Sequence, residues 1–222
     1  QILPLPETLV ALNSTEGSTI LKSPGTIDDS FWRLSIHLTT QINNGACALA
    51  TTAVVLNALS PESLNGNYIN QSSILSESDC VRRRILGVSD DVAGSSNAEK
   101  KKVETNASKG SGPVAAAAVE TETSQQKTDL ESALTHLSKH GSSLSQASGY
   151  FGCYSVPARE VYAKESTLEQ FESDLATTIK AGEFIVVDFH RASVGLAGHA
   201  HFSPVAAYAP NCEGGGGGRV LF

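Results

Sequence analysis

Residues 40–59 read TQINNGACALATTAVVLNAL. From Cys47 to Leu59 nearly every residue is apolar or small, and none is charged. This run is too long for a typical strand and is apolar on all faces, so it predicts a buried helix. The turn signal NNG just before the run places Cys47 in the first turn of that helix.

The position of Cys47 favours a reactive thiol. The free backbone N–H groups and the positive end of the helix dipole stabilise a thiolate at a helix start. Gln41 lies six residues earlier, where its amide N–H could be turned toward an oxyanion formed at the cysteine. The alternative interpretation is a small, inert cysteine packed at the start of a buried helix.

Composition limits the classes of function. A chain of 222 residues is long enough for one domain with a sizeable core. A net charge of −7 without a basic cluster argues against nucleic acid as a partner. No apolar run reaches the length that spans a bilayer, which argues against a membrane protein. Four widely spaced cysteines without a CxxC pair predict free thiols in a reducing compartment, the cytoplasm.

The predicted organisation is a single domain over 1–222, interrupted by a low-complexity insertion at 88–127. The insertion is rich in Gly, Ser, Lys, Glu, Ala and Thr and holds no aromatic residue, so we expect it to be disordered. The chain begins with Gln and contains no Met, which indicates a fragment of a longer chain.

Hydrophobic spacing and turn signals predict an α+β fold, with helices in the first half and an antiparallel sheet in the second. Trp32, the only Trp, is expected to be a core anchor beside the central helix. The further elements we expect are helices at 14–21, 130–137, 144–154 and 167–179, and strands at 155–162, 184–189, 201–208 and 219–222.

A cysteine at a helix start, with histidines about 150 residues downstream on a strand, is the layout of a cysteine acyl-transfer enzyme. His201 opens the strand after a loop and is the best placed general base. Two alternatives stay open: a plain structural histidine, and a metal pair of His199 and His201 on one strand face. His136 and His140 share a helix face, but the Glu of an HExxH zinc motif is replaced by Leu137.

Two stretches carry a family resemblance. Residues 40–59 resemble the central motif of phytochelatin synthases, in which a Gln six residues before the catalytic Cys leads into a helix ending VLNAL. Residues 190–208, HRASVGLAGHAHFSPVAAY, resemble that family's histidine segment. Arg191 lies ten residues before His201, as the family's arginine does before its histidine.

The resemblance implies a papain-like fold with a cysteine-bearing helix packed on an antiparallel sheet. It implies that Cys47 is the nucleophile, His201 the acid/base and Gln41 the oxyanion donor, with Arg191 holding a substrate carboxylate. The implied reaction transfers γ-glutamylcysteine from glutathione to a second glutathione or to a growing chain. Heavy-metal ions such as cadmium or zinc would stimulate it as glutathione thiolates, and no organic cofactor is implied.

The chain departs from the family pattern near the nucleophile and the base. Ala48 replaces a Gly after the nucleophile, Ala46 replaces an aromatic residue before it, and Ala200 replaces a Gly before the histidine. The acid partner of the histidine is expected about two residues after Phe222. We therefore expect a catalytic domain truncated before its last strands, with impaired turnover in that form.

Three functions compete at this point: the dipeptidyl transferase, a hydrolase that releases glycine without polymerisation, and a non-catalytic binder of metal or glutathione. The sequence leaves open which metal activates and whether a homodimer forms.

Overall fold

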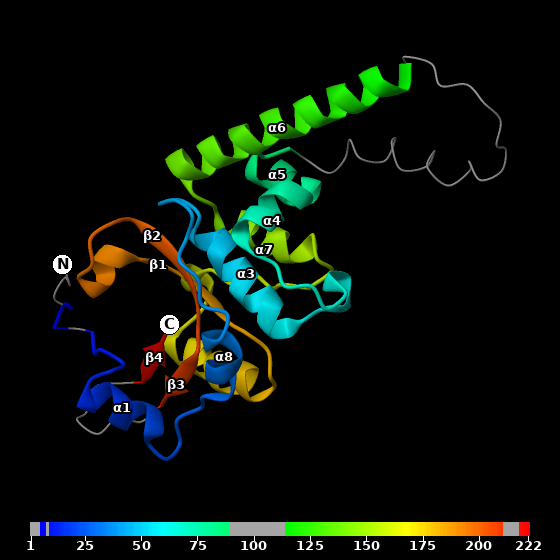
Figure 1. Ribbon diagram of the computed structural model, residues 1–222. Coiled ribbons are helices and arrows are strands. Elements are labelled where there is room, and N and C mark those ends of the chain that lie inside the picture. The colour runs from blue at the N-terminus through cyan, green and yellow to red at the C-terminus, as the bar shows by residue number, and fades with distance from the viewer. Residues whose placement is uncertain (1–4, 8, 89–113, 211–217) are drawn as a thin grey trace.

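The computed structural model describes residues 5–7, 9–88, 114–210 and 218–222. Helices predominate, and the strands form two small antiparallel sheets near the C-terminal end of the chain (Figure 1). The helices are α1 (Thr15–Lys22), α2 (Asp29–Ser35), α3 (Cys47–Leu59), α4 (Gln71–Glu77), α5 (Asp79–Ile85), α6 (Val114–His140), α7 (Leu144–Gly152) and α8 (Leu168–Lys180). The strands are β1 (Val186–His190), β2 (Ala200–Pro204), β3 (Ala207–Ala209) and β4 (Arg219–Leu221), and short 3-10 turns lie at Glu62–Leu64, Ala163–Glu165 and Arg191–Val194.

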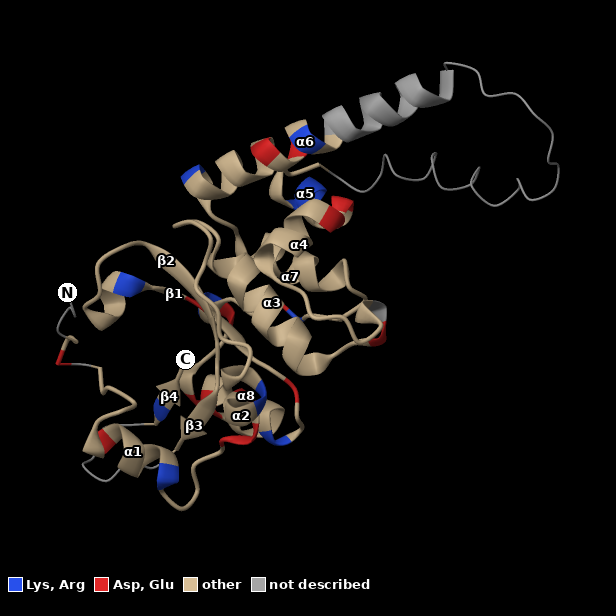
Figure 2. Ribbon diagram, in the orientation of Figure 1, with Lys and Arg blue, Asp and Glu red and all other residues tan. Residues whose placement is uncertain are grey.

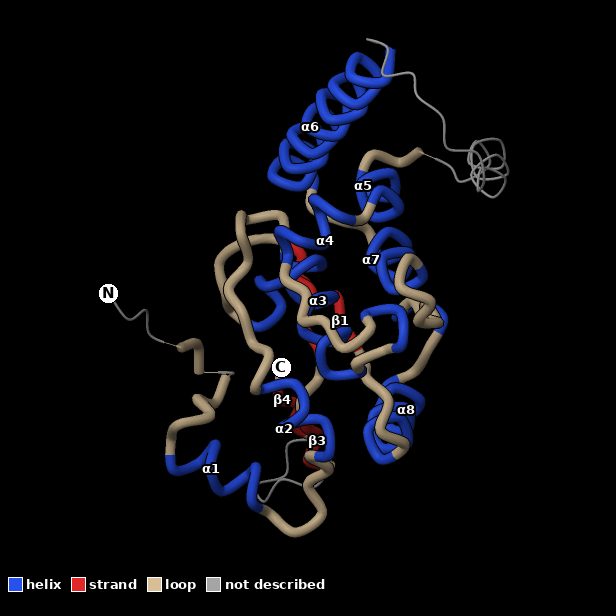
Figure 3. The backbone as a smooth tube through the Cα atoms, turned by 45° about the vertical axis from the view of Figure 1, so that its right-hand side comes forward, coloured by secondary structure: helices blue, strands red, loops and turns tan. Residues whose placement is uncertain are grey.

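The central helix has the predicted start and end. α3 is buried on nearly all of its surface, and both Leu49 and Leu56 are 0% exposed. Its ribbon carries no charged residue in Figure 2. Helices α2, α4 and α7 and strand β2 pack around it, and Figure 3 shows strands beside it from a second direction. This packing covers an apolar helix that would be unstable with any side in water.

The helix caps follow the sequence signals. The Ser14 side chain accepts a hydrogen bond from Gly17 N at the start of α1, and Thr167 does the same for Gln170 N at the start of α8. Both caps satisfy backbone N–H groups that have no partner within the helix. The short helix expected at 14–21 and the amphipathic helix expected at 167–179 are therefore confirmed, as is the helix after residue 144.

The expected strand 201–208 is divided between two sheets. β2 pairs antiparallel with β1, with Phe189 opposite His201, whereas β3 pairs with β4. The change of partner occurs after Pro204, because Val205 N donates to Ile185 O (2.8 Å) and the next residue, Ala206, donates its N–H to Leu221 O (2.7 Å). Along an antiparallel strand, the backbone N–H and C=O groups of successive residues point alternately toward and away from the neighbouring strand. Because Val205 N points toward β1, the ring nitrogen of Pro204 points away from β1 and removes no bond from that sheet.

Two expectations about packing are wrong. Residues 155–162 form no strand, and every residue from 157 to 162 is exposed, so an extended segment there would bury no apolar face. Trp32 is 70% exposed and contacts Phe31 edge-on, with ring centroids 4.9 Å apart. Helix α2 instead buries Ser30 and Leu34.

Helix α6 begins earlier than the sequence predicted. It starts at Val114 rather than near residue 130, so residues 114–127 of the expected disordered insertion are helical. The run of four alanines that follows Val114 has the highest intrinsic helix propensity, and this explains the longer helix. The remainder of that insertion, residues 89–113, lies outside the described residues.

A disulfide joins two cysteines that were expected to be free. Cys80 on α5 and Cys153 at the C-terminal end of α7 are bonded across a separation of 73 residues. Their spacing carried no pairing signal because the bond depends on α5 packing against α7. Cys47 is a free thiol, and Cys212 lies outside the described residues. None of the helices in the described part of the chain is long and apolar enough to cross a membrane.

We expect reduction of the Cys80–Cys153 bond to lower the free energy of unfolding by about 2–4 kcal/mol, because the bond restricts a long loop in the unfolded chain. Equilibrium denaturation with and without reductant measures the difference. The Cys80→Ser/Cys153→Ser double variant is the control, since its unfolding should not respond to reductant. Equal unfolding free energies for the wild-type chain in both conditions would contradict the prediction.

Candidate active site

Cys47 is the first residue of α3 and is 8% exposed. The residue before it, Ala46, is the N-cap, and its side chain makes no capping hydrogen bond. No cap side chain therefore satisfies the backbone N–H groups in the first turn of α3. The starts of α1 and α8 differ, because cap side chains accept hydrogen bonds there. Such N–H groups can bind negative charge that develops beside the cysteine.

The loop before Cys47 is held by hydrogen bonds that converge on Asn43. The Asn43 side-chain oxygen accepts from Gly45 N (2.9 Å), and its backbone oxygen accepts from Ala46 N (3.1 Å). The same backbone oxygen accepts from Gln41 Nε2 (2.7 Å). The Gln41 amide and the start of α3 therefore share one acceptor, which keeps that amide close to the nucleophile helix.

Gly45 allows this loop to lie against the last turns of α6. A Cβ atom at Gly45 would lie 1.6 Å from the carbonyl oxygen of Leu137, a backbone atom that cannot rotate away. Only glycine fits this approach. The C-terminal end of α6 thus supports the turn that leads into Cys47.

A buried hydrogen bond brings the cysteine helix to the histidine strand. Thr51, one turn after Cys47, donates its hydroxyl to the carbonyl oxygen of Phe202 (3.1 Å), and Phe202 directly follows His201. The alternation of the β1–β2 ladder directs this carbonyl away from β1, so Thr51 satisfies an acceptor that the sheet leaves open. Cys47 and Phe202 also belong to one apolar cluster. Within the described residues no hydrogen bond joins Cys47 directly to His201.

Arg191 and Phe189 surround the His201 ring. Arg191 Nη2 lies 3.4 Å from His201 Nδ1, and Phe189 contacts the ring edge-on with centroids 5.8 Å apart. Burial, and second the Arg191 guanidinium, lower the pKa of His201 below 6.5. Because a guanidinium only donates, Nδ1 accepts and the neutral ring carries its proton on Nε2. The result is a neutral imidazole at pH 7, the form that a general base requires.

Tyr150 is a residue of the site that no motif in the sequence indicated, and it belongs to the same apolar cluster as Cys47. Tyr150 is 0% exposed, and its hydroxyl lies 2.9 Å from the Ser142 hydroxyl. Burial raises the pKa of Tyr150 to about 12, although the Ser142 hydrogen bond opposes the shift and Cys47 adds to it. The phenol is therefore neutral beside the cysteine. Its position on α7 looks like ordinary helix packing in the sequence.

The other histidines do not join Cys47 and His201. The His136 and His140 rings lie 4.8 Å apart on α6, and His199 lies 6.4 Å from His190 beside β1, ring centroid to ring centroid. The described residues contain no group of three or more His, Cys, Asp or Glu side chains able to hold a metal ion.

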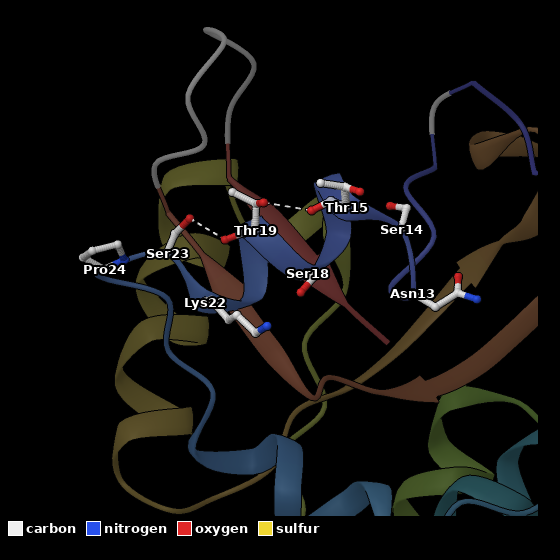
Figure 4. A pocket seen from close by; sticks show the side chains of 8 residues that line it. All are labelled: Asn13, Ser14, Thr15, Ser18, Thr19, Lys22, Ser23 and Pro24. Atoms are coloured by element: carbon white, nitrogen blue, oxygen red, sulfur yellow. Dashed lines mark hydrogen bonds between the residues drawn. The ribbon is translucent and has the colours of Figure 1, made fainter.

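A surface pocket of about 620 Å³ lies along α1, away from the residues above (Figure 4). Two hydrogen bonds drawn there, from the hydroxyls of Thr19 and Ser23 to backbone oxygens one turn earlier, serve the helix itself. Lys22 is the single charged side chain in the lining, which holds no cysteine, histidine or carboxylate. We therefore place the candidate site at Cys47 and His201. The pocket is lined by Asn13, Ser14, Thr15, Ser18, Thr19, Lys22, Ser23 and Pro24.

Comparison with known proteins gives one family. A family model described as phytochelatin synthase matches residues 1–77 and 118–213, which are most of the chain. The matched ranges include Cys47, Gln41, Arg191 and His201 and omit most of the low-complexity segment. No curated protein matches the chain.

We expect Thr51→Val to lower the free energy of unfolding by about 1–2 kcal/mol, because it leaves the Phe202 carbonyl without this donor while keeping the side-chain shape. Thermal or chemical denaturation measures the loss. Thr19→Val on the exposed face of α1 is the control, since its hydroxyl bonds only within its own helix. A Thr51→Val chain as stable as wild type would show that the bond does not hold helix and strand together.

We expect Arg191→Gln to raise the pKa of His201 toward 6.5 without reaching it, because the positive neighbour is removed and burial remains. NMR titration of the His201 ring in the variant and in the wild-type chain measures the shift. In the wild-type chain the unfolded state takes up this proton near pH 6.5 and the folded state only at lower pH. The folded chain should thus lose stability as the pH falls below 6.5.

Proposed function

Because the chain belongs to the phytochelatin synthase family, a family of acyltransferases, we propose that it transfers γ-glutamylcysteine from glutathione through a thioester on Cys47. The observation that carries the proposal is the Thr51–Phe202 hydrogen bond, which joins the helix of Cys47 to the strand of His201. A thiol and a neutral imidazole on adjoining elements are the two groups that acyl transfer through cysteine needs.

In the proposed acylation, a substrate carboxylate draws the Arg191 guanidinium away from His201 Nδ1, and this unprotonated nitrogen takes the proton of the Cys47 thiol while the sulfur attacks the carbonyl carbon that joins cysteine to glycine in glutathione. The carbonyl oxygen becomes an oxyanion, and Gln41 and the backbone N–H groups at the start of α3 stabilise it. The C–N bond then breaks, and His201 returns the proton to the leaving amine of glycine. A γ-glutamylcysteinyl thioester stays on Cys47.

In the proposed second half, the amine of another glutathione attacks the thioester. His201 accepts a proton from that amine, and the Cys47 thiol is regenerated as the new amide forms. The product is one γ-glutamylcysteine unit longer than the acceptor. Cadmium or zinc would enter as a glutathione thiolate, that is, as part of the substrate rather than as a metal held by the chain.

Arg191 is the proposed binder of a substrate carboxylate. Its guanidinium lies beside the His201 ring, so an anion held there would be next to the group that protonates the leaving glycine. A carboxylate bound to Arg191 would also offset the positive charge that lowers the pKa of His201.

The proposal includes a papain-like arrangement, in which the cysteine helix packs against an antiparallel sheet that carries the histidine. Helix α3 beside β2, and the pairing of β2 with β1, support it. We also propose the cytoplasm as the site of the reaction, because glutathione is its substrate. Disulfides are rare in that compartment, so the Cys80–Cys153 bond would be subject to reduction there.

We expect glutathione and cadmium to yield free glycine and a ladder of γ-glutamylcysteine products, both lost in Cys47→Ser because a hydroxyl is a far weaker nucleophile here. Mass spectrometry of the products measures both, for residues 1–222 and for a longer chain that continues past Phe222. The Cys80→Ser/Cys153→Ser variant is the matched control and should keep the ladder.

Release of glycine without the ladder would show that the protein is a hydrolase rather than a transferase. If neither chain forms either product but glutathione still binds, the protein is a binding module and not an enzyme of either kind.

A further inference from the structure

A buried glutamine side chain holds the loop that carries Gln41. Gln71 is the first residue of α4 and is 3% exposed. Its Nε2 donates to the carbonyl oxygen of Thr40 (2.9 Å), and its Oε1 accepts from the N–H of Ile42 (2.9 Å). A backbone carbonyl can only accept and a backbone N–H can only donate, so these partners fix which way the Gln71 amide is turned.

The two bonds lie on either side of Gln41. The Thr40 carbonyl belongs to the peptide plane before Gln41, and the Ile42 N–H belongs to the plane after it. The backbone angles φ and ψ of Gln41 are the rotations that relate these two planes. Holding both planes therefore fixes the direction in which the Gln41 side chain leaves the backbone.

A second buried amide ties the segment of Gln71 to the helix of Cys47. Asn57, on α3, donates its Nδ2 to the carbonyl oxygen of Ile69 (2.8 Å) and accepts from Ile69 N at Oδ1 (3.0 Å). Ile69 lies two residues before Gln71. The amides of Asn57 and Gln71 thus connect α3 to the Gln41 loop through one short segment. This connection holds the loop in a fixed position relative to Cys47.

The Gln41 side chain is held at its far end as well. Its Nε2 donates one N–H to the backbone oxygen of Asn43, which also accepts from Ala46 N. A primary amide has two such N–H groups. The second one can serve a substrate oxygen only if the backbone of Gln41 keeps its direction.

We propose that Gln71 is a positioning residue, which aims the Gln41 amide at the oxyanion formed during acylation of Cys47. This role rests on the proposed function and adds to it a residue outside the reacting groups. Burying an amide is costly unless both of its polar atoms are paired. An apolar side chain would fill the same space but would fix neither peptide plane.

The test is a double-mutant comparison of the rate of glycine release from glutathione. We expect Gln41→Ala to lower kcat about 100-fold, the usual loss for one oxyanion donor. Gln71→Met keeps the side-chain length and lacks the amide, and should lower kcat about 10-fold with little change in KM, as for loss of an interaction made only in the transition state. In the Gln41→Ala background the same change should have no further effect. An equal loss in both backgrounds would overturn the positioning role.

Gln146→Met is the matched control. The Gln146 amide also joins two elements, because its Nε2 donates to the carbonyl oxygens of Arg84 and Ile85, but it has no link to the Gln41 loop. It should retain the wild-type kcat. A loss as large as that of Gln71→Met would mean that any broken amide bridge slows the reaction, and would overturn the proposal.

Hydrogen exchange at the Ile42 N–H gives a readout independent of activity. Exchange should accelerate in Gln71→Met and stay unchanged in Gln146→Met. Gln71→Glu keeps the acceptor for Ile42 and loses the donor to Thr40, so its Ile42 exchange should stay slow while its kcat falls. If neither the wild-type chain nor the longer chain that continues past Phe222 releases glycine, the proposed function is overturned, whereas unaltered Ile42 exchange in an active Gln71→Met chain overturns the positioning role alone.

Discussion

Helix α3 has no side that can face water, and α2, α4, α7 and β2 pack around it to cover it. Leu34 from α2, Phe151 from α7 and Phe202 from β2 all belong to the apolar cluster that surrounds it. Burial of this kind is non-directional, so it explains why the elements gather but not how they are oriented. Orientation comes from a few buried polar bonds, such as the bond from Thr51 to the Phe202 carbonyl. The apolar burial and this single bond together place the start of the helix beside the strand of His201.

The chemistry of the candidate site also depends on apolar burial together with a few polar contacts. Cys47 is at the one end of α3 where backbone N–H groups have no cap side chain, and the loop before it is held by side-chain amides rather than by a sheet. His201 is kept neutral by its burial and by Arg191. A neutral base favours transfer of the thiol proton at the moment of attack. A thiolate–imidazolium pair formed before the attack would require a higher histidine pKa.

The sequence predicted those features that depend on neighbours along the chain. The apolar run of α3 and the cap at Thr167 are local signals, and both helices were predicted close to their observed bounds. Pairing of Cys80 with Cys153, and of Gln71 with the backbone around Gln41, depends on which elements pack together, and no spacing encodes that. The burial of Trp32 was predicted wrongly for a related reason: hydrophobicity predicts a preference for burial, but Trp32 lies two residues from both Ser30 and Leu34 and so is on the opposite face of α2 from the buried one. The helix start and the strand start indicated Cys47 and His201 as candidates, whereas the role of Arg191 came from motif resemblance alone, because its contact with His201 is made in space.

The Cys80–Cys153 bond has a topological consequence. It encloses the whole of the low-complexity segment and α6, so a single protease cut at any peptide bond between the two cysteines would leave one covalent molecule in two pieces. The N-terminal piece would hold the cysteine helix and the C-terminal piece the histidine strand. Such a nicked form would migrate as one species without reductant and as two with it, and its halves would still meet in the apolar cluster to which Leu49 and Phe202 both belong. The segment that interrupts the family match is thus placed where sequence length and chain continuity can vary without separating Cys47 from His201.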